Sequence, residues 1–237
     1  MRQGKRIGVV IPALNEADAI GRVINAIPDW VDEIVVADNG STDRTAIAAE
    51  VAGAHVTIEP IRGYGAACQA GIKALPAVDI IVFLDGDYSD YPEDMHVLVD
   101  PILASEADFV VGSRVLGTAQ KGALTPQQRF GNWLACRLMR LFFGARFTDL
   151  GPFRAIRAET LEALEMHDRA YGWTVEMQIK AARGGLAIKE VPIRYRPRIG
   201  VSKISGTVRG TLLAGYTILS VIARSALSRP SARCPQG

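Results

Sequence analysis

The sequence predicts an α/β protein in which helices flank a doubly wound, mostly parallel β-sheet. Short apolar runs typical of strands buried on both faces alternate along the chain with segments whose apolar residues recur at helical spacing. Strand–helix alternation of this kind is the pattern of a parallel sheet. The chain has 237 residues and neither a linker nor an internal repeat divides it, so we expect a single large domain with a sizeable core.

In the first half of the chain, strands are expected at residues 7–11, 33–37, 55–59 and 80–84. A helix is expected after each of them. The first helix can be capped by Asn15 or Asp18, and the second follows the turn-rich residues 38–43. Pro12 is expected to stop the first strand, and the fourth helix starts near Pro92, because proline suits the first turn of a helix.

In the second half, strands are expected at residues 108–111 and 187–195, and helices at about 127–143, 174–183 and 206–227. One further short helix precedes residue 174. The helix at 127–143 carries a broad apolar face, which we expect to pack in the core. We expect the sheet domain to span residues 1–205, and a C-terminal amphipathic helix with a basic tail to span residues 206–237.

The fourth strand ends in Asp85-Gly86-Asp87, the stretch around which we expect the chain to be organised. Gly86 allows a turn that can bring both carboxylates to one point. Two hard oxygen ligands at the carboxyl end of a central strand suit Mg²⁺ or Mn²⁺, shared with the phosphates of a substrate. Asn15, Glu16 and Asp38 also follow strands, so they are expected to converge with the two aspartates on one crevice.

Charge is distributed unevenly along the chain. From Arg183 to the end there are ten Lys and Arg against one acid, whereas the preceding 182 residues carry 17 basic and 24 acidic side chains. A basic terminal segment indicates an anionic partner. The three cysteines have no metal-ligand spacing, and no signal peptide is visible, so we expect a reduced, cytoplasmic location. The apolar stretch at 211–223 is too short to span a bilayer.

Six motifs in order resemble inverting family 2 glycosyltransferases of the GT-A fold, and most of all dolichol-phosphate mannosyltransferases and related polyprenyl-phosphate glycosyltransferases. They are spread over nearly the whole chain. They read Val10-Ile11-Pro12-Ala13-Leu14-Asn15-Glu16, Asp38-Asn39-Gly40-Ser41-Thr42-Asp43, Phe83-Leu84-Asp85-Gly86-Asp87, Gly112-Ser113-Arg114, Phe153-Arg154 and Ser202-Lys203. Two departures are Ser89, where the family often has glutamine, and the segment 149–154, which is one residue shorter here.

The resemblance implies a nucleotide-sugar donor linked to GDP or UDP, such as GDP-mannose or UDP-glucose. Pro12 and Glu16 would lie at the nucleotide, with Glu16 accepting hydrogen bonds from the ribose, and Asp38 would contact the base or ribose. Asp85 and Asp87 would hold a Mg²⁺ or Mn²⁺ ion on the donor diphosphate. The candidate donor-binding set is Pro12, Asn15, Glu16, Asp38, Gly63, Gly65, Asp85, Gly86 and Asp87.

The expected acceptor is a polyprenyl phosphate, which is already anionic and needs positioning and charge neutralisation more than a base. Four basic residues can supply this, namely Arg114, Arg129, Arg198 and Lys203. The alternative is an acceptor hydroxyl, which requires a general base, and Asp149 and Glu176 are the candidates.

Three other classes compete with a glycosyltransferase. A sugar-1-phosphate nucleotidylyltransferase opens with a glycine-rich loop after the first strand, where this chain has residues 12–16. A non-catalytic nucleotide-sugar-binding module is less favoured because both aspartates are intact. No nucleic-acid partner is expected, because no such binding motif is present.

A membrane contact is also predicted for the last helix. Its apolar residues recur at about i, i+3 and i+4, and arginines flank them at Arg209, Arg224, Arg229 and Arg233. This pattern suits a helix lying on anionic lipid at the cytoplasmic face of a membrane. Packing of the same helix on the sheet or on a membrane partner subunit is the alternative.

Overall fold

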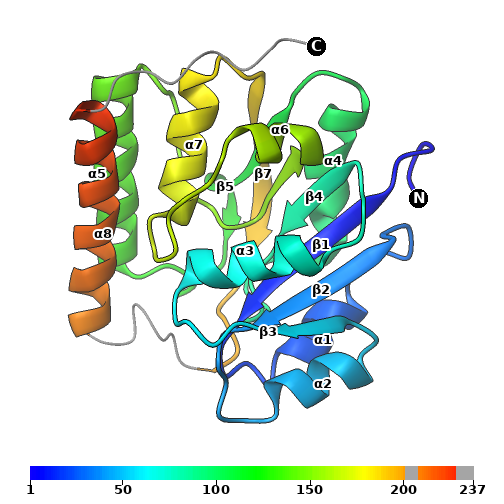
Figure 1. Ribbon diagram of the computed structural model, residues 1–237. Coiled ribbons are helices and arrows are strands. Elements are labelled where there is room, and N and C mark those ends of the chain that lie inside the picture. The colour runs from blue at the N-terminus through cyan, green and yellow to red at the C-terminus, as the bar shows by residue number, and fades with distance from the viewer. Residues whose placement is uncertain (201–207, 228–237) are drawn as a thin grey trace.

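A computed structural model describes residues 1–200 and 208–227 of the chain (Figure 1). Its strands are β1 Ile7–Ala13, β2 Glu33–Asp38, β3 His55–Ile58, β4 Ile80–Phe83, β5 Phe109–Ala119, β6 Arg154–Arg157 and β7 Ile188–Tyr195. Its helices are α1 Ile20–Asn25, α2 Thr45–Val51, α3 Tyr64–Ala74, the 3₁₀ turn η1 Pro92–Asp94, α4 Met95–Leu103, α5 Pro126–Phe143, α6 Ala158–Ala163, α7 Trp173–Arg183 and α8 Val208–Leu227.

The strands form one sheet in the order β3-β2-β1-β4-β6-β5-β7. All neighbouring pairs are parallel except those of β6, which is antiparallel to both β4 and β5. The α/β fold with a mostly parallel sheet is therefore confirmed. Because β1, β2 and β4 are parallel neighbours, their carboxyl ends meet at one edge, where ligands bind in folds of this kind.

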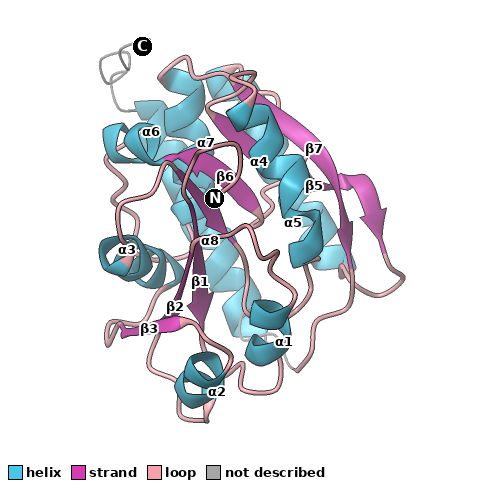
Figure 2. Ribbon diagram, turned by 90° about the vertical axis from the view of Figure 1, so that its right-hand side faces the viewer, coloured by secondary structure: helices cyan, strands magenta, loops and turns pink. Residues whose placement is uncertain are grey.

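Helices cover both faces of the sheet, and successive β1 residues point to opposite sides. Val9 packs into the core beneath α1, α2 and α4, whereas Val10 packs into the core beneath α3, α5, α6, α7 and α8. Figure 2 shows α3 and α6 on one side of the strands and α1 and α4 on the other. Strands that are buried on both faces explain the continuous apolar runs in the sequence.

Two predicted element boundaries were wrong. Pro12 does not stop β1, which continues to Ala13. The pairing of β1 with β4 ends at Val10 and only β2 remains alongside, so the missing N–H of Pro12 fits a strand that is an edge at this point. The first helix begins at Ile20 after Ala19, not after a capping Asn15 or Asp18.

Strand β6 was not predicted, and β5 is longer than expected. Strand β6 has only four residues and directly follows the segment at residues 149–153. A segment this short shows no recognisable alternation of apolar and polar residues. In contrast, α5 begins and ends as its sequence dictates. Thr125 and Gln128 form a reciprocal capping box, Pro126 occupies the first turn, and Gly144 ends the helix with a left-handed φ of 67°.

Helix α8 packs beside α5 and α7, as Figure 1 also shows. Ile222 is buried in the core, and Ile218 and Val221 pack against it. Part of the apolar surface of this helix is thus internal. In the residues that the structure describes, no helix has both the length and the apolar character needed to cross a bilayer.

Candidate functional site

A crevice of about 460 Å³ opens at the carboxyl ends of β1, β2 and β4. It brings together residues from six separate stretches of the chain. The lining residues are Pro12, Ala13, Leu14, Asn15, Glu16, Asn39, Arg62, Gly63, Tyr64, Ala67, Asp85, Gly86, Asp87, Tyr171 and Arg198. All but two of the candidate donor-binding residues line it, the exceptions being Asp38 and Gly65.

The two aspartates after β4 have different partners. Asp85 Oδ1 accepts a hydrogen bond of 3.1 Å from the Tyr64 hydroxyl. Asp87 Oδ1 accepts from the Ser89 amide at 2.9 Å and from the Ser89 hydroxyl at 2.5 Å. The left-handed residue of this turn is Tyr88, with φ 62°, and not Gly86. A Cβ at Gly86 would meet only ordinary contacts of 3.4 Å or more, so the expected use of its backbone freedom was wrong.

The electrostatics of this pair suit a divalent cation. Burial, and then the charge of Asp87, raise the pKa of Asp85 to about 7. A buried pair of like charges gains most from a cation that neutralises both. Within the described ranges, no group of three or more His, Cys, Asp and Glu side chains is placed to hold a metal. Asp85 and Asp87 therefore fit a metal whose remaining ligands come from the substrate.

Arg198 crosses the crevice and contacts two acids that follow different strands, β1 and β4. Its Nη2 lies 2.5 Å from Glu16 Oε1, and its Nη1 lies 3.1 Å from Asp87 Oδ2. The loop that carries it is anchored by Arg196, whose Nε donates to the Tyr88 carbonyl at 2.6 Å and whose guanidinium stacks 3.4 Å from the Tyr88 ring centroid. Arg196 was not among the predicted site residues, although it lies in the basic terminal segment that begins at Arg183.

The loops after β1 and β2 hold each other in place. Asn15 has a φ of 53°, its amide donates to Ser41 Oγ at 2.9 Å, and its Oδ1 accepts from the Thr42 amide at 2.7 Å. Asp38 is 3% exposed and its Oδ1 accepts from the Ser41 amide at 2.7 Å. Asp38 thus closes the turn, and Asn39, the next residue, lines the crevice instead.

Two glycines fix the start of α3 and hence Tyr64. A Cβ at Gly63 would lie 2.0 Å from the Arg169 carbonyl oxygen, and one at Gly65 would lie 2.1 Å from that of Asp168. Gly63 also has a φ of 152° and donates its amide to Asn39 Oδ1 at 2.7 Å. The Gly63-Tyr64-Gly65 pattern was the available sign that Tyr64 belongs to the site.

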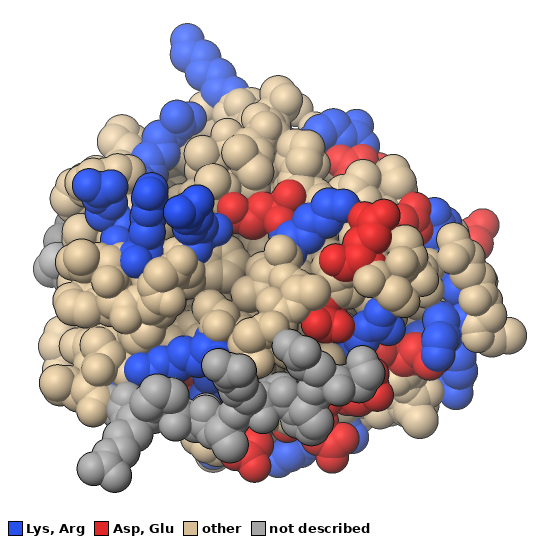
Figure 3. Space-filling model, turned by 90° about the horizontal axis from the view of Figure 1, so that it is seen from above, with Lys and Arg blue, Asp and Glu red and all other residues tan. Residues whose placement is uncertain are grey.

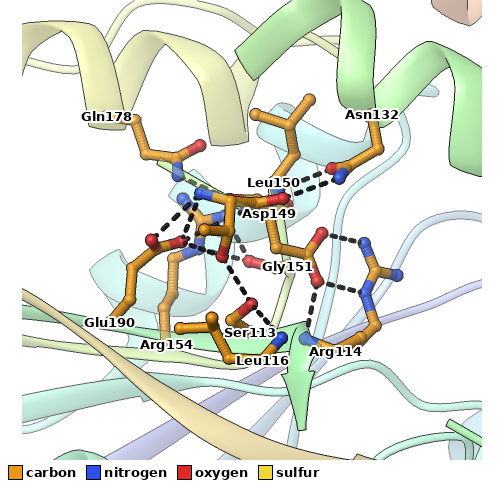
Figure 4. Close-up of polar contacts among 11 residues, drawn as sticks. Ser113, Arg114, Leu116, Asn132, Asp149, Leu150, Gly151, Arg154, Gln178 and Glu190 are labelled. Atoms are coloured by element: carbon orange, nitrogen blue, oxygen red, sulfur yellow. Dashed lines mark hydrogen bonds and ion pairs between the residues drawn. The ribbon is translucent and has the colours of Figure 1, made fainter. Parts of the chain in front are cut away.

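Arg114 and Asp149 form a buried ion pair next to the crevice (Figure 4). Asp149 Oδ1 accepts from Arg114 Nη2 at 2.6 Å, and Oδ2 accepts from both Nε and the backbone amide at 2.8 Å. Burial alone would lower the pKa of the guanidinium, but Asp149 raises it above its ordinary value. Since both carboxylate oxygens are occupied, Asp149 positions Arg114 and is poorly placed to act as a base.

Arg154, from the fifth motif, holds the backbone behind this pair. It is 1% exposed, and it donates to the carbonyls of Leu150 at 3.1 Å, Gly151 at 3.0 Å and Thr174 at 3.0 Å. Burial lowers its pKa to about 10. Figure 4 shows the Arg154 side chain behind the segment that carries Asp149 and Gly151. Its contacts indicate a positioning role for this residue.

A second cavity, of about 300 Å³, begins at the same aspartates and runs between α5 and α8. Its inner end holds Asp85, Asp87, Arg114 and Arg198. Its outer walls are provided by Gln127, Gln128, Gly131, Asn132, Leu150, Pro152, Gly215 and Ile218, among others. The site therefore has one opening toward β1 and β2 and another toward the two long helices.

The remaining candidates lie elsewhere. Arg129 is exposed on α5 and lines a neighbouring cavity together with Arg114. Glu176 is not brought to the crevice, because its carboxylate accepts from the His167 and Asp168 amides at 2.7–3.2 Å and pairs with Lys180 at 2.9 Å. Lys203 lies outside the described residues.

Comparison with known proteins places the chain in a family. Residues 8–164 match the family described as "Glycosyl transferase family 2". The chain is 30% identical to an undecaprenyl-phosphate mannosyltransferase of Micrococcus luteus, with 92% of this chain and 96% of that protein covered. It is 34% identical to a dolichyl-phosphate hexose transferase of Haloferax volcanii, with 91% and 93% covered.

Solved structures agree with this result. A glucosyl-3-phosphoglycerate synthase of Mycobacterium tuberculosis, in complex with Mn²⁺, UDP and phosphoglyceric acid, superposes with a TM-score of 0.76 at 26% identity, covering 96% of this chain and 81% of that one. The same enzyme is known in complex with Mg²⁺ and UDP. The chain described here is a glycosyltransferase that belongs to glycosyl transferase family 2.

Proposed function

We propose that the enzyme transfers a hexose from a nucleoside diphosphate sugar to a polyprenyl phosphate, with inversion at the anomeric carbon. In this proposal the crevice at β1, β2 and β4 receives the donor, and Glu16 accepts hydrogen bonds from its ribose. Asp85 and Asp87 hold a Mg²⁺ or Mn²⁺ ion, which would stabilise the negative charge of the leaving nucleoside diphosphate. The metals and UDP bound by the structural neighbour support this side of the proposal.

The observation that carries the acceptor assignment is the second cavity. Arg114 and Arg198 lie at its inner end beside the aspartates, and Leu150, Pro152 and Ile218 line its walls. A cationic inner end with apolar walls fits a lipid whose phosphate enters first. The names of the two relatives from Micrococcus luteus and Haloferax volcanii point to acceptors of the same chemistry.

The reaction requires little proton transfer from the protein. An acceptor phosphate oxygen forms a bond to the anomeric carbon while the bond from that carbon to the donor β-phosphate oxygen breaks. Arg114 and Arg198 orient the attacking phosphate and offset its charge. A hydroxyl acceptor is less favoured, because Asp149 is fully occupied by Arg114 and Glu176 lies outside the cavity.

The experiment offers GDP-mannose and UDP-glucose with undecaprenyl or dolichyl phosphate in detergent, with Mn²⁺, Mg²⁺ or EDTA, and identifies products by mass. We expect one glycosyl polyprenyl phosphate, formed only with metal and lost in Asp87→Asn. The matched controls are the corresponding polyprenol without phosphate, and phosphoglyceric acid, the ligand of the structural neighbour. If the enzyme used phosphoglyceric acid or the polyprenol and not the polyprenyl phosphate, the acceptor assignment would be overturned and the donor assignment would stand.

A further inference from the structure

Helix α5 exposes large apolar side chains that were expected to lie in the core. Phe130 is 62% exposed, Trp133 58% and Leu141 73%, and the rings of Phe130 and Trp133 lie 5.9 Å apart. Only Ala135, Cys136 and Met139 of this helix are buried. The prediction that the apolar residues of this helix pack in the core is therefore wrong for the largest of them, which face outward.

Arginines occupy the same outward face. Phe130, Trp133, Arg137, Arg140 and Leu141 follow one another at helical spacing, and all five are exposed. Neither α5 nor α8 contains an acidic residue. Figure 3 shows basic side chains gathered at the left edge, the side on which α5 and α8 lie in Figure 1, while acidic side chains lie mostly toward the centre and right.

A cavity of about 460 Å³ hollows this surface. Arg129, Arg137 and Arg140 line it together with Trp133. Among the lining residues that the structure describes, the one carboxylate is that of Asp149, and it is paired with Arg114. Three arginines around an opening, without acids to balance them, fit phosphate groups. Arg114 also lines the second cavity, so this basic surface is continuous with the proposed entrance for the acceptor.

We infer that the exposed face of α5 is the surface on which the enzyme lies against a bilayer containing anionic lipid. Phe130, Trp133 and Leu141 enter the headgroup region, and Arg137 and Arg140 contact lipid phosphates. A second copy of this chain is a poor occupant, because a symmetric contact would place the same arginines against each other. This inference rests on the proposed function in one respect, because the proposed acceptor, a polyprenyl phosphate, resides in that bilayer.

The test is co-sedimentation of the full chain with vesicles of phosphatidylglycerol and phosphatidylcholine, compared with phosphatidylcholine alone, without donor or acceptor. We expect binding to the anionic vesicles that weakens with added salt. The double variants Phe130→Gln/Trp133→Gln and Arg137→Gln/Arg140→Gln should each bind about tenfold less tightly. The matched controls Ile47→Gln/Val51→Gln, on α2 at 59% and 84% exposure, and Arg22→Gln, on α1, should bind as the parent does.

A second readout reports the position of one side chain. A quencher attached to lipid headgroups should quench the fluorescence of the parent and lose most of this effect in Trp133→Phe. Of the other two tryptophans, Trp173 is buried, and Trp30 is partly buried against the core on the opposite face of the sheet from α5. Equal loss of binding in the α2 control, no binding by the parent at low salt, or quenching unchanged in Trp133→Phe would overturn the inference. Activity on polyprenyl phosphate in detergent does not depend on a bilayer, so failure of this inference is distinguishable from failure of the proposed function.

Discussion

Arg198 connects two acids that follow different strands, Glu16 after β1 and Asp87 after β4. Its guanidinium partly neutralises the carboxylates to which we assign the donor and its metal. Binding of a divalent cation must therefore compete with this guanidinium for Asp87.

From this competition we expect Arg198→Gln to bind Mn²⁺ more tightly than the parent in the absence of nucleotide, by several-fold, as measured by Mn²⁺ electron paramagnetic resonance. At the same time its KM for the acceptor phosphate should rise. The control is Arg194→Gln, which removes a surface ion pair to Asp94 and should leave Mn²⁺ binding unchanged. Weaker Mn²⁺ binding by Arg198→Gln would show that the guanidinium does not compete with the metal.

Asp90 provides a second test at this scale. It is 1% exposed, and in the described part of the chain neither carboxylate oxygen has a hydrogen-bond partner. Burial, and then the charges of Asp85 and Asp87, raise its pKa well above the ordinary value. Between the unfolded and folded pKa values the folded chain binds more protons than the unfolded chain, so this carboxyl makes the protein less stable as the pH rises.

Asp90→Asn should consequently raise the free energy of unfolding at pH 8 by about 1–3 kcal/mol, and change it less at pH 4, where the carboxyl is protonated in the folded chain. Urea denaturation at the two pH values measures the difference. If Asp90→Asn changed the free energy of unfolding equally at both pH values, or lowered it at pH 8, the buried charge of Asp90 would not be what destabilises the parent.

At the level of single residues, the sequence located strand-end groups well and their partners poorly. Asp85, Asp87 and Glu16 could be placed because parallel strands end at one edge. The occupation of Asp149 by Arg114, and of Glu176 by the amides at residues 167 and 168, depends on segments that meet only in the folded chain. Local patterns carry no information about such contacts.

Among the helices and strands, too, features that depend on local sequence were predicted and features that depend on packing were not. Strands β1 to β4 and β7 were predicted to within about two residues at each end. The end of β5 was predicted at residue 111 but lies at Ala119, and β6, with four residues and two antiparallel neighbours, was missed. Helix α5 was located correctly, because its cap residues are local, but the direction of its apolar face was not. The face that a helix presents to the core depends on its neighbours, and α8 and α7 cover only one side of α5.

The start of α3 gives the prediction at this scale. Gly65→Ala should destabilise the protein by about 1–3 kcal/mol, because the new Cβ would lie 2.1 Å from the Asp168 carbonyl oxygen. It should also reduce turnover, since Tyr64 and its bond to Asp85 would be displaced. The control Gly21→Ala, in a helix where a Cβ meets nothing within 4 Å, should stabilise by up to about 1 kcal/mol. Thermal unfolding and initial rates check both, and a Gly65→Ala variant as stable and active as the parent would contradict the assignment.

On the scale of the whole molecule, the crevice is lined by segments that lie far apart in the sequence. Residues after β1, β2 and β4 line it together with Tyr171 and Arg198. A ligand that bridges these parts binds the folded chain and not the unfolded one, so it must stabilise the fold by linkage. The stabilisation reports occupancy without any knowledge of the acceptor.

We therefore expect thermal unfolding to shift upward when a nucleoside diphosphate and Mn²⁺ are present together, and much less with either alone, because the aspartates and the diphosphate share the metal. At a ligand concentration one hundred times the Kd the gain is about 2.7 kcal/mol. Comparing UDP with GDP identifies the preferred base, and Asp87→Asn should lose the joint effect while retaining its fold. A shift of the same size in Asp87→Asn, or one that EDTA does not reduce, would mean that the diphosphate binds without the metal at Asp85 and Asp87.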